Sequence, residues 1–247
     1  MNVLLLMAGA SDAFREAGYL YPKPLIEIGG KSLVQHVIES LAPLLALGGR
    51  LIVAVRHDEN AQYHIAAVVR LLNPTAEVLE IRGETAGAAC SALLAVDWID
   101  NDEPLIIING DQLILADVAL AIREFRERSL DGGIVVFKDV HPRWSFVKCG
   151  VDGLVIEAAE KRPISDMATA GFYYFKSGKC FIMAVQSMIL KCANVNGLFY
   201  VCPAYNELIL RNQRIGTYLI EKQQYVSLTN PHAVELYENK LNDKLRK

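Results

Sequence analysis

The sequence MNVLLLMAGASDAFREAGYLYPKPL, residues 1–25, carries the pattern on which the fold prediction rests. Its apolar run Val3–Met7 is short, continuous and followed by small residues, which is typical of a strand buried on both faces. A polar loop with Gly9 follows and ends where two prolines hold the chain extended around Lys23. A buried strand, a loop of small residues and a fixed cation indicate a phosphate-binding loop, although an ordinary strand–helix turn with a solvated lysine has the same local pattern.

Short apolar runs alternate with segments of helical periodicity as far as residue 130. Strands are expected at residues 51–55, 78–81 and 105–108, and helices at residues 33–41, 58–72 and 88–98. Ser32 and Asp58 precede or begin two of these helices and are the expected N-caps. This alternation predicts right-handed crossovers and an α/β fold with a doubly wound, mainly parallel sheet of the Rossmann-like kind.

After residue 130 the pattern becomes less regular. Shorter apolar runs predict strands at 133–137, 146–149, 154–156 and 171–175, and helices follow at 179–191, 204–211 and 231–245. These strands are less consistently apolar, which favours a mixed or antiparallel part of the same sheet. Neither a linker nor a repeat separates the two parts, so we predict a single domain of residues 1–247.

Composition limits the class of protein. Hydrophobic residues make up 52% of the chain, charged residues 21%, and the net charge is −3, an ordinary globular profile without the basic excess of a nucleic-acid partner. The apolar runs are shorter than the roughly 18 residues of a membrane span. The five cysteines form no CxxC pair, which favours reduced thiols in a cytoplasmic protein over a metal site.

Several motifs in order resemble the sugar-phosphate nucleotidylyltransferases, whose opening pattern is MAGxGSRF, then PKPL and GKP. The corresponding segments are MAGASDAF, PKPL, GETAGAAC, INGDQ, HPRWSFVK, EKRPISDMATAGFYYFKSG and YNELI. They cover nearly the whole chain and are most similar to the BcbE-like group of capsule-polysaccharide loci. The resemblance implies a nucleotide-diphospho-sugar transferase-like (GT-A-like) fold, with a nucleotide-binding half at 1–130 and an acceptor-binding half at 131–247.

The resemblance also implies roles for residues of the nucleotide-binding half. Lys23 is expected to bind the phosphates around the phosphorus under attack, and Asp111 to hold Mg²⁺. The remaining nucleotide-binding positions are Ala8, Gly9, Ala10, Gly83, Thr85, Gly87, Asn109 and Gly110. By position alone, Asp111 follows a buried strand, where a carboxylate suits a metal site and is also a common turn residue.

On the acceptor side the resemblance assigns Lys161 to the acceptor phosphate and Glu160 to acceptor hydroxyls. Gly171 is expected to let the acceptor approach the backbone. Arg143 is a candidate for an anionic part of the acceptor, and Trp144 for stacking on a sugar. A solvated Glu–Lys pair, a packed tryptophan and a surface arginine are the structural alternatives.

The first loop departs from the family pattern. Ser11 stands where the family has its second glycine, and Ala13 where it has the arginine that contacts the triphosphate. Removing such a cation typically costs several kcal/mol of transition-state stabilisation. Arg15 is a hypothetical substitute because it lies only two residues further on.

The metal site also departs from the family. Many members supply a second metal-binding aspartate before a C-terminal Gly-Thr, but the corresponding stretch 225–231 contains no carboxylate. Glu207 and Asp166 are candidate replacements.

These features predict a Mg²⁺-dependent nucleotidyltransferase that joins a nucleoside triphosphate to a phosphorylated acceptor and releases pyrophosphate. One alternative is a degenerate homologue that binds nucleotide without catalysis, motivated by Ser11 and Ala13. Another is a glycosyltransferase of related fold, which usually carries Asp-x-Asp where this chain has Asp111 followed by Leu113. A homo-oligomer is compatible with the resemblance.

Overall fold

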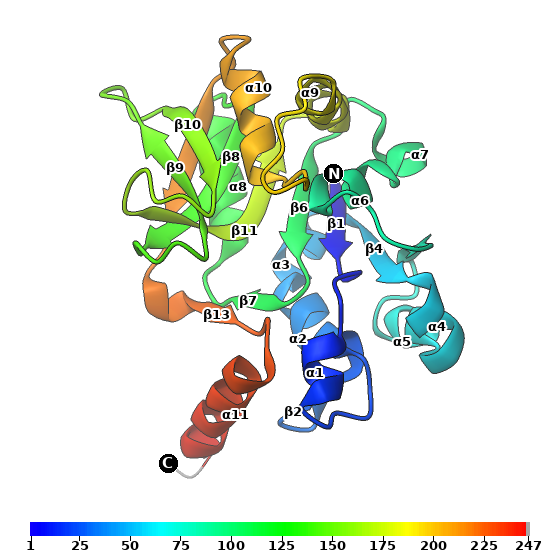
Figure 1. The fold of residues 1–247 in the computed structure, drawn as a ribbon. Coiled ribbons are helices and arrows are strands. Elements are labelled where there is room, and N and C mark those ends of the chain that lie inside the picture. Colours follow the sequence, from blue (N-terminus) through cyan, green and yellow to red (C-terminus); the bar gives the residue numbers. More distant parts are fainter. Residues whose placement is uncertain (246–247) are drawn as a thin grey trace.

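The computed structural model describes residues 1–245 and contains one large sheet covered by helices (Figure 1). The sheet has nine strands: β1 (Asn2–Leu6), β4 (Arg50–Arg56), β5 (Glu77–Ile81), β6 (Leu105–Asn109), β8 (Gly132–Lys138), β9 (Ser145–Cys149), β10 (Val155–Glu160), β11 (Met167–Phe175) and β12 (Ile215–Leu219). Its central strands follow the order β6-β1-β4-β5 and are parallel, as the alternating pattern predicts.

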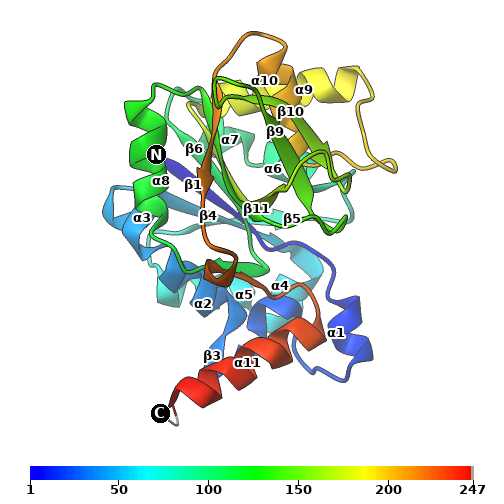
Figure 2. The ribbon, with the colours of Figure 1, turned by 90° about the vertical axis from the view of Figure 1, so that its left-hand side faces the viewer.

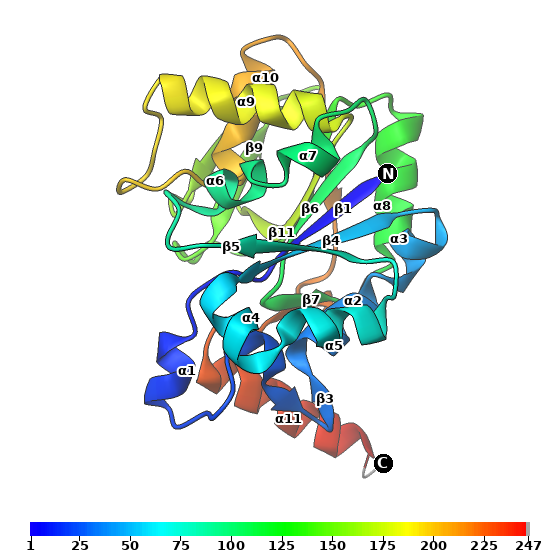
Figure 3. The same ribbon diagram turned by 90° about the vertical axis from the view of Figure 1, so that its right-hand side faces the viewer.

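Strand β1 shows why its sequence is a continuous apolar run. Val3 and Leu5 face one core of the protein, Leu4 faces the other, and all three are fully buried. The first core is formed with α2 (Leu33–Ser40), α3 (Ala42–Ala46), α5 (Ile65–Leu72) and α8 (Val118–Glu127). The second is formed with α6 (Ala88–Leu93), α7 (Val96–Ile99), α9 (Gly178–Leu190) and α10 (Tyr205–Ile209). Figure 3 shows the sheet between these two layers, as expected for a doubly wound fold.

The second half of the chain extends the same sheet with antiparallel strands. Strand β11 runs antiparallel to both β6 and β8. Strands β9 and β10 form an antiparallel hairpin, and β12 is parallel to β8. The mixed sheet predicted from the looser pattern is therefore confirmed, and the two halves share one sheet.

Two predicted helices are each divided in the structure. The segment 58–72 forms α4 (His57–Tyr63) and α5, separated by His64 in the left-handed conformation with a φ of 55°. The side chain of Asn60 accepts a hydrogen bond of 2.7 Å from the Ala66 amide and so begins the second helix in a new direction. Asp58 lies inside α4 and is not its N-cap, which is a correction to the prediction. Likewise, 88–98 forms α6 and α7.

Shorter elements complete the chain. They are α1 (Asp12–Glu16), the 3₁₀ turns Lys23–Leu25, Cys202–Ala204 and Lys222–Gln224, β2 (Glu27–Ile28), β3 (Lys31–Ser32), β7 (Gln112–Ile114), β13 (Tyr225–Ser227) and α11 (Pro231–Leu245). The Ser32 hydroxyl accepts a hydrogen bond from the Gln35 amide, so the predicted cap of α2 is confirmed. Figure 2 shows α11 projecting beside α1 and β3. In residues 1–245 no helix has both the length and the apolar character needed to cross a membrane.

Candidate active site

A cavity of about 500 Å³ opens at the carboxyl ends of β1, β4, β5 and β6. In open α/β sheets ligands bind at this edge, outside the carboxyl ends of the strands, at the point where the strand order reverses. Eleven of the residues selected from sequence line the cavity: Ala8, Gly9, Ala10, Lys23, Gly83, Thr85, Gly87, Asn109, Gly110, Asp111 and Glu160. The structure therefore brings together residues that are as far apart in the sequence as Ala8 and Glu160.

Lys23 and Asp111 form an ion pair inside the cavity. The Lys23 Nζ lies 3.0 Å from Asp111 Oδ2, and the two side chains are 9% and 25% exposed. A Cβ atom on Gly9 would lie 3.0 Å from the same Nζ, so a side chain there would press on the lysine. The backbone amide of Lys23 donates a 3.0 Å hydrogen bond to the hydroxyl of Ser11, which is buried. The loop residue that departs from the family pattern thus supports the lysine.

The glycine-rich turn before α6 is held by a distant segment. Gly87 has a φ of 108°, and a Cβ there would lie 2.5 Å from the carbonyl oxygen of Phe199. The Phe199 amide donates to the Ala86 carbonyl at 2.8 Å, and the Ala89 amide donates to the Phe199 carbonyl at 3.0 Å. Only glycine fits this close approach of two backbones.

Thr85 holds the same turn internally. Its hydroxyl donates to the Gly87 carbonyl at 3.2 Å and lies 2.7 Å from the Ser91 hydroxyl. Thr85 does not cap α6, whose N-cap, Gly87, has no side chain.

Glu160 and Ser145 form the opposite wall of the cavity. The Ser145 hydroxyl donates a hydrogen bond to the Glu160 carboxylate. Burial raises the pKa of Glu160, and the Ser145 hydrogen bond and the charge of Lys161 only partly offset this effect. Burial also raises the pKa of the neighbouring Cys202 thiol well above its ordinary value, so burial disfavours its thiolate form.

Comparison with known proteins identifies the family of this chain. The family model described as "Nucleotidyl transferase" matches residues 2–193. The chain belongs to the nucleotidyl transferase family. It is 29% identical over 185 residues to the bifunctional protein GlmU of Methanocaldococcus jannaschii, and 26% identical over 189 residues to the mannose-1-phosphate guanylyltransferase catalytic subunit beta of Dictyostelium discoideum. Each match covers 71% of this chain but only 40% and 49% of the relatives, so the chain spans less than half their length.

Solved structures show the same fold over nearly the whole chain. A nucleoside-diphosphate-sugar pyrophosphorylase from Vibrio cholerae superposes with a TM-score of 0.83 at 25% identity, covering 97% of this chain and all of that one. A UDP-glucose pyrophosphorylase complexed with UDP-glucose has a TM-score of 0.75 over 98% of each chain, at 14% identity. The single-domain fold predicted from sequence is therefore confirmed.

Lys161, which the family resemblance assigns to the acceptor phosphate, does not line the cavity itself. It follows β10 with a φ of 52°, and its Nζ donates a 3.2 Å hydrogen bond to the Tyr200 hydroxyl. Tyr200 does line the cavity, so the ammonium group stands one side chain behind its wall.

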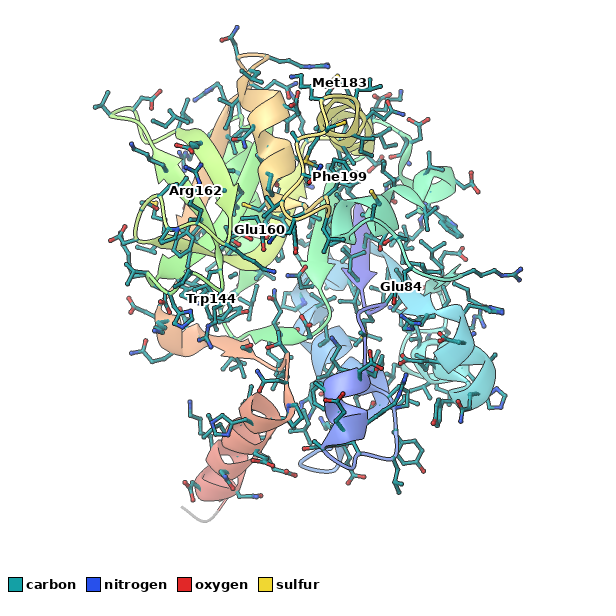
Figure 4. The ribbon with its side chains drawn as sticks, in the orientation of Figure 1. Glu84, Trp144, Glu160, Arg162, Met183 and Phe199 are labelled. Atoms are coloured by element: carbon teal, nitrogen blue, oxygen red, sulfur yellow. The ribbon has the colours of Figure 1, made fainter. Side chains whose placement is uncertain are left out.

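Gly171, Arg143 and Trp144 lie outside the cavity of this family member. A Cβ on Gly171 would meet the side chain of Gln112 at 2.5 Å, behind the cavity wall. Trp144 packs edge-on against Phe137 and Tyr225, each at 5.4 Å between ring centroids, and Arg143 stacks on it at 4.2 Å. In Figure 4, Trp144 lies below Glu160, near β13. The structure supports the packed-tryptophan alternative and not sugar stacking.

The stretch in which many nucleotidyl transferases carry a second aspartate lies beside Asp111. The Leu228 amide donates to the Asp111 carbonyl at 2.8 Å, and the hydroxyls of Ser227 and Thr229 are 3.1 Å apart. The backbone of this stretch therefore lies beside Asp111, and the stretch carries hydroxyl side chains and no carboxylate.

Neither proposed replacement ligand reaches the cavity. Glu207 forms an ion pair with Lys191 at 2.6 Å, and Asp166 pairs with Lys138 at 2.7 Å. Across the described residues no group of three or more His, Cys, Asp or Glu side chains is arranged to hold a metal. Asp111 is thus a single carboxylate beside the Lys23 ammonium, and the predictions for Glu207 and Asp166 are wrong.

Arg15 does not turn toward the cavity. Its guanidinium pairs with Asp12 at 3.1 Å and with the buried Glu59 at 3.0 Å. Arg56 lines the cavity instead, together with Glu84, and neither was selected from the sequence. Arg56 ends a buried strand, which is the same signal that identified Asp111, and it was overlooked because no family motif includes it.

Proposed function

We propose that this chain is a sugar-phosphate nucleotidyltransferase, which transfers a nucleotidyl group from a nucleoside triphosphate to a phosphorylated sugar or similar acceptor and releases pyrophosphate. The observation that carries the proposal is the Lys23–Asp111 pair between two glycine-containing loops at the carboxyl edge of the sheet. The names of the matched relatives support the same reaction class.

The chemistry follows from the charges in the cavity. An oxygen of the acceptor phosphate attacks the α-phosphorus in line with the departing pyrophosphate, so no covalent enzyme intermediate is required. Lys23 neutralises charge on the α-phosphate under attack. Its ammonium packs closely against Gly9, so it is held in position before substrate binds. Lys161, held by Tyr200, attracts the acceptor phosphate, and Glu160 accepts hydrogen bonds from acceptor hydroxyls.

Asp111 fits a Mg²⁺ ion that arrives with the triphosphate. Mg²⁺ is commonly held by one or two carboxylates together with substrate phosphates and water, and Asp111 is partly exposed in the cavity. The ion would supply charge neutralisation on the phosphate oxygens. Asp111→Asn is expected to weaken Mg²⁺-dependent triphosphate binding at least tenfold in calorimetry while leaving metal-free binding intact. Equal binding by both proteins across a Mg²⁺ titration would contradict this role.

The direct test is pyrophosphate release from GTP, CTP, UTP, dTTP and ATP, each with glucose 1-phosphate and mannose 1-phosphate. Release that requires both substrates supports the proposal. Triphosphate binding without release from any pair would favour a non-catalytic homologue. On the resemblance of its motifs alone, we extend the proposal to the synthesis of a nucleotide sugar for capsule or surface polysaccharide.

A further inference from the structure

Arg56 lies at the end of the cavity that is bounded by the glycine-rich turn. It is the last residue of β4 and pairs in register with Ile81, the last residue of β5. The chain continues from Ile81 to Gly83 and Glu84, and all four residues line the cavity. Asp111 follows β6, which lies on the far side of β1 from β4. The Lys23–Asp111 pair and Arg56 therefore mark different parts of one site.

The guanidinium of Arg56 is fixed by one neighbour. Its Nε and Nη2 atoms each donate a 3.1 Å hydrogen bond to the two carboxylate oxygens of Asp58. This fork arrangement orients the planar group, and the side chain is 21% exposed. Among the described residues, Nη1 takes part in none of the hydrogen bonds, so Arg56 keeps a donor for a ligand.

Glu84 supplies an acceptor in the same region. It lines the cavity, is exposed, and forms no ion pair within residues 1–245. Hydrogen bonding to Asp58 raises the pKa of Arg56, and the charge of Glu84 contributes to the same shift, which places the two side chains within electrostatic reach. In Figure 4, Glu84 and Glu160 stand on opposite sides of the carboxyl end of β1.

We propose that Arg56 and Glu84 read the nucleobase, and that the preferred base carries a carbonyl oxygen and an exocyclic amino group, as guanine and cytosine do. Arg56 donates to the carbonyl oxygen or an adjacent ring nitrogen, and Glu84 accepts from the amino group. Uracil and thymine offer a carboxylate only the ring N3–H, which lies between two carbonyl oxygens that repel it, and adenine lacks the carbonyl oxygen. This inference rests on the proposed function, because it names the nucleotide that the same site uses.

The test is calorimetric binding of GTP, CTP, UTP, dTTP and ATP with Mg²⁺, together with GMP and CMP. The wild-type protein is expected to bind GTP or CTP about tenfold or more tightly than UTP, dTTP and ATP. Arg56→Ala should lower affinity for the preferred base about tenfold, equally in its triphosphate and its monophosphate. Glu84→Gln should reduce the discrimination against UTP or ATP.

Arg15→Ala is the matched control, because that arginine also pairs with carboxylates but lies outside the cavity. Its nucleotide affinities should equal those of the wild type. Arg56→Lys keeps the charge without the fork, and is expected to reproduce the loss of base discrimination while the thermal midpoint stays unchanged. This second variant separates a contact with the base from a folding defect.

Three results would overturn the inference. They are a wild-type preference for UTP, dTTP or ATP, an equal loss of affinity for all five triphosphates in Arg56→Ala, and a loss confined to triphosphates, which would mean a phosphate contact. If the wild-type protein binds no nucleotide, the proposed function itself fails. If it binds one and Arg56→Ala has no base-dependent effect, only this inference fails.

Discussion

At the proposed nucleotide end of the cavity, parallel strands bring whole loops to one edge of the sheet, whereas at the proposed acceptor end antiparallel strands contribute single side chains. Residues 8–10, 83–85, 87–88 and 109–111 all line the cavity, and most of them are glycine, alanine or threonine. On the other side, Glu160 faces the cavity while its neighbour Lys161 stands behind Tyr200. Where parallel strands end at one edge of the sheet, the position of a motif after its strand is enough to predict that it reaches the site. Where antiparallel strands form the wall, the strand register and the face on which each side chain lies must also be known.

The largest expected effect comes from breaking the charge pair at the nucleotide end. Lys23→Ala removes a cation that is fixed in place before substrate binds, so pyrophosphate release should fall at least about 100-fold. Lys31→Ala is the control, because Lys31 is exposed and pairs with Glu39 on the surface. Turnover within twofold of wild type in Lys23→Ala would remove this lysine from the mechanism.

The backbone contact between the two halves of the chain predicts a stability effect. Gly87→Ala forces a Cβ against the Phe199 carbonyl in addition to an unfavourable φ, and should lower the free energy of unfolding by about 3 kcal/mol. Gly30 also has a positive φ, of 82°, but a Cβ added there would have no heavy atom within 4 Å. Gly30→Ala should therefore lower the free energy of unfolding by only about 1 kcal/mol. Urea unfolding of both variants measures the difference. An equal loss of unfolding free energy in the two variants would show that the Phe199 backbone moves aside.

The packing of Trp144 and Arg143 predicts that neither residue contacts the acceptor. Trp144→Ala should lower the free energy of unfolding by about 2 kcal/mol, because the ring packs on Phe137 and Tyr225. Arg143→Ala should leave both stability and the KM for the sugar phosphate near wild type, since its guanidinium covers the outer face of the ring. A tenfold rise in that KM for Arg143→Ala would restore the interpretation drawn from the sequence.

Glu160 gives the smallest effect and a pH signature. Because burial raises the pKa of its carboxyl in the folded state, the folded protein holds this proton more tightly than the unfolded chain does. The charged form therefore destabilises the fold at neutral pH, and this cost disappears as the pH falls below the ordinary glutamate value of 4.5. Glu160→Gln should be up to about 1 kcal/mol more stable at pH 7 and equal to wild type near pH 4.

The opposite trend would contradict the buried-carboxyl explanation: a Glu160→Gln variant less stable at pH 7 but matching wild type in acid would mean that the ionised form is favoured. Thermal melts at pH 4 and pH 7 distinguish the two cases. The same variant should raise the KM for the acceptor more than that for the triphosphate.

The sequence was most informative where local chemistry alone fixes geometry. Apolar runs such as Val3–Met7 predicted the buried strands, and the end of one of them placed Asp111, whereas the pairing of Asp111 with Lys23 was seen only in the structure. It was less informative where long-range contacts decide. Nothing near His64 in the sequence shows that Asn60 will divide the helix, and nothing near Trp144 shows that its neighbours are Phe137 and Tyr225. Arg56 was missed because a single arginine after a strand has many possible roles.

The hydrogen bond from the Lys23 amide to the Ser11 hydroxyl limits how the first loop can be redesigned. A glycine at position 11 restores the family's pattern but removes the acceptor on which the PKP turn now depends. Ser11→Gly is therefore not a simple return to that pattern, because it should loosen the turn that carries Lys23. A family-type loop in this chain would need a new acceptor for the Lys23 amide as well as the glycine itself.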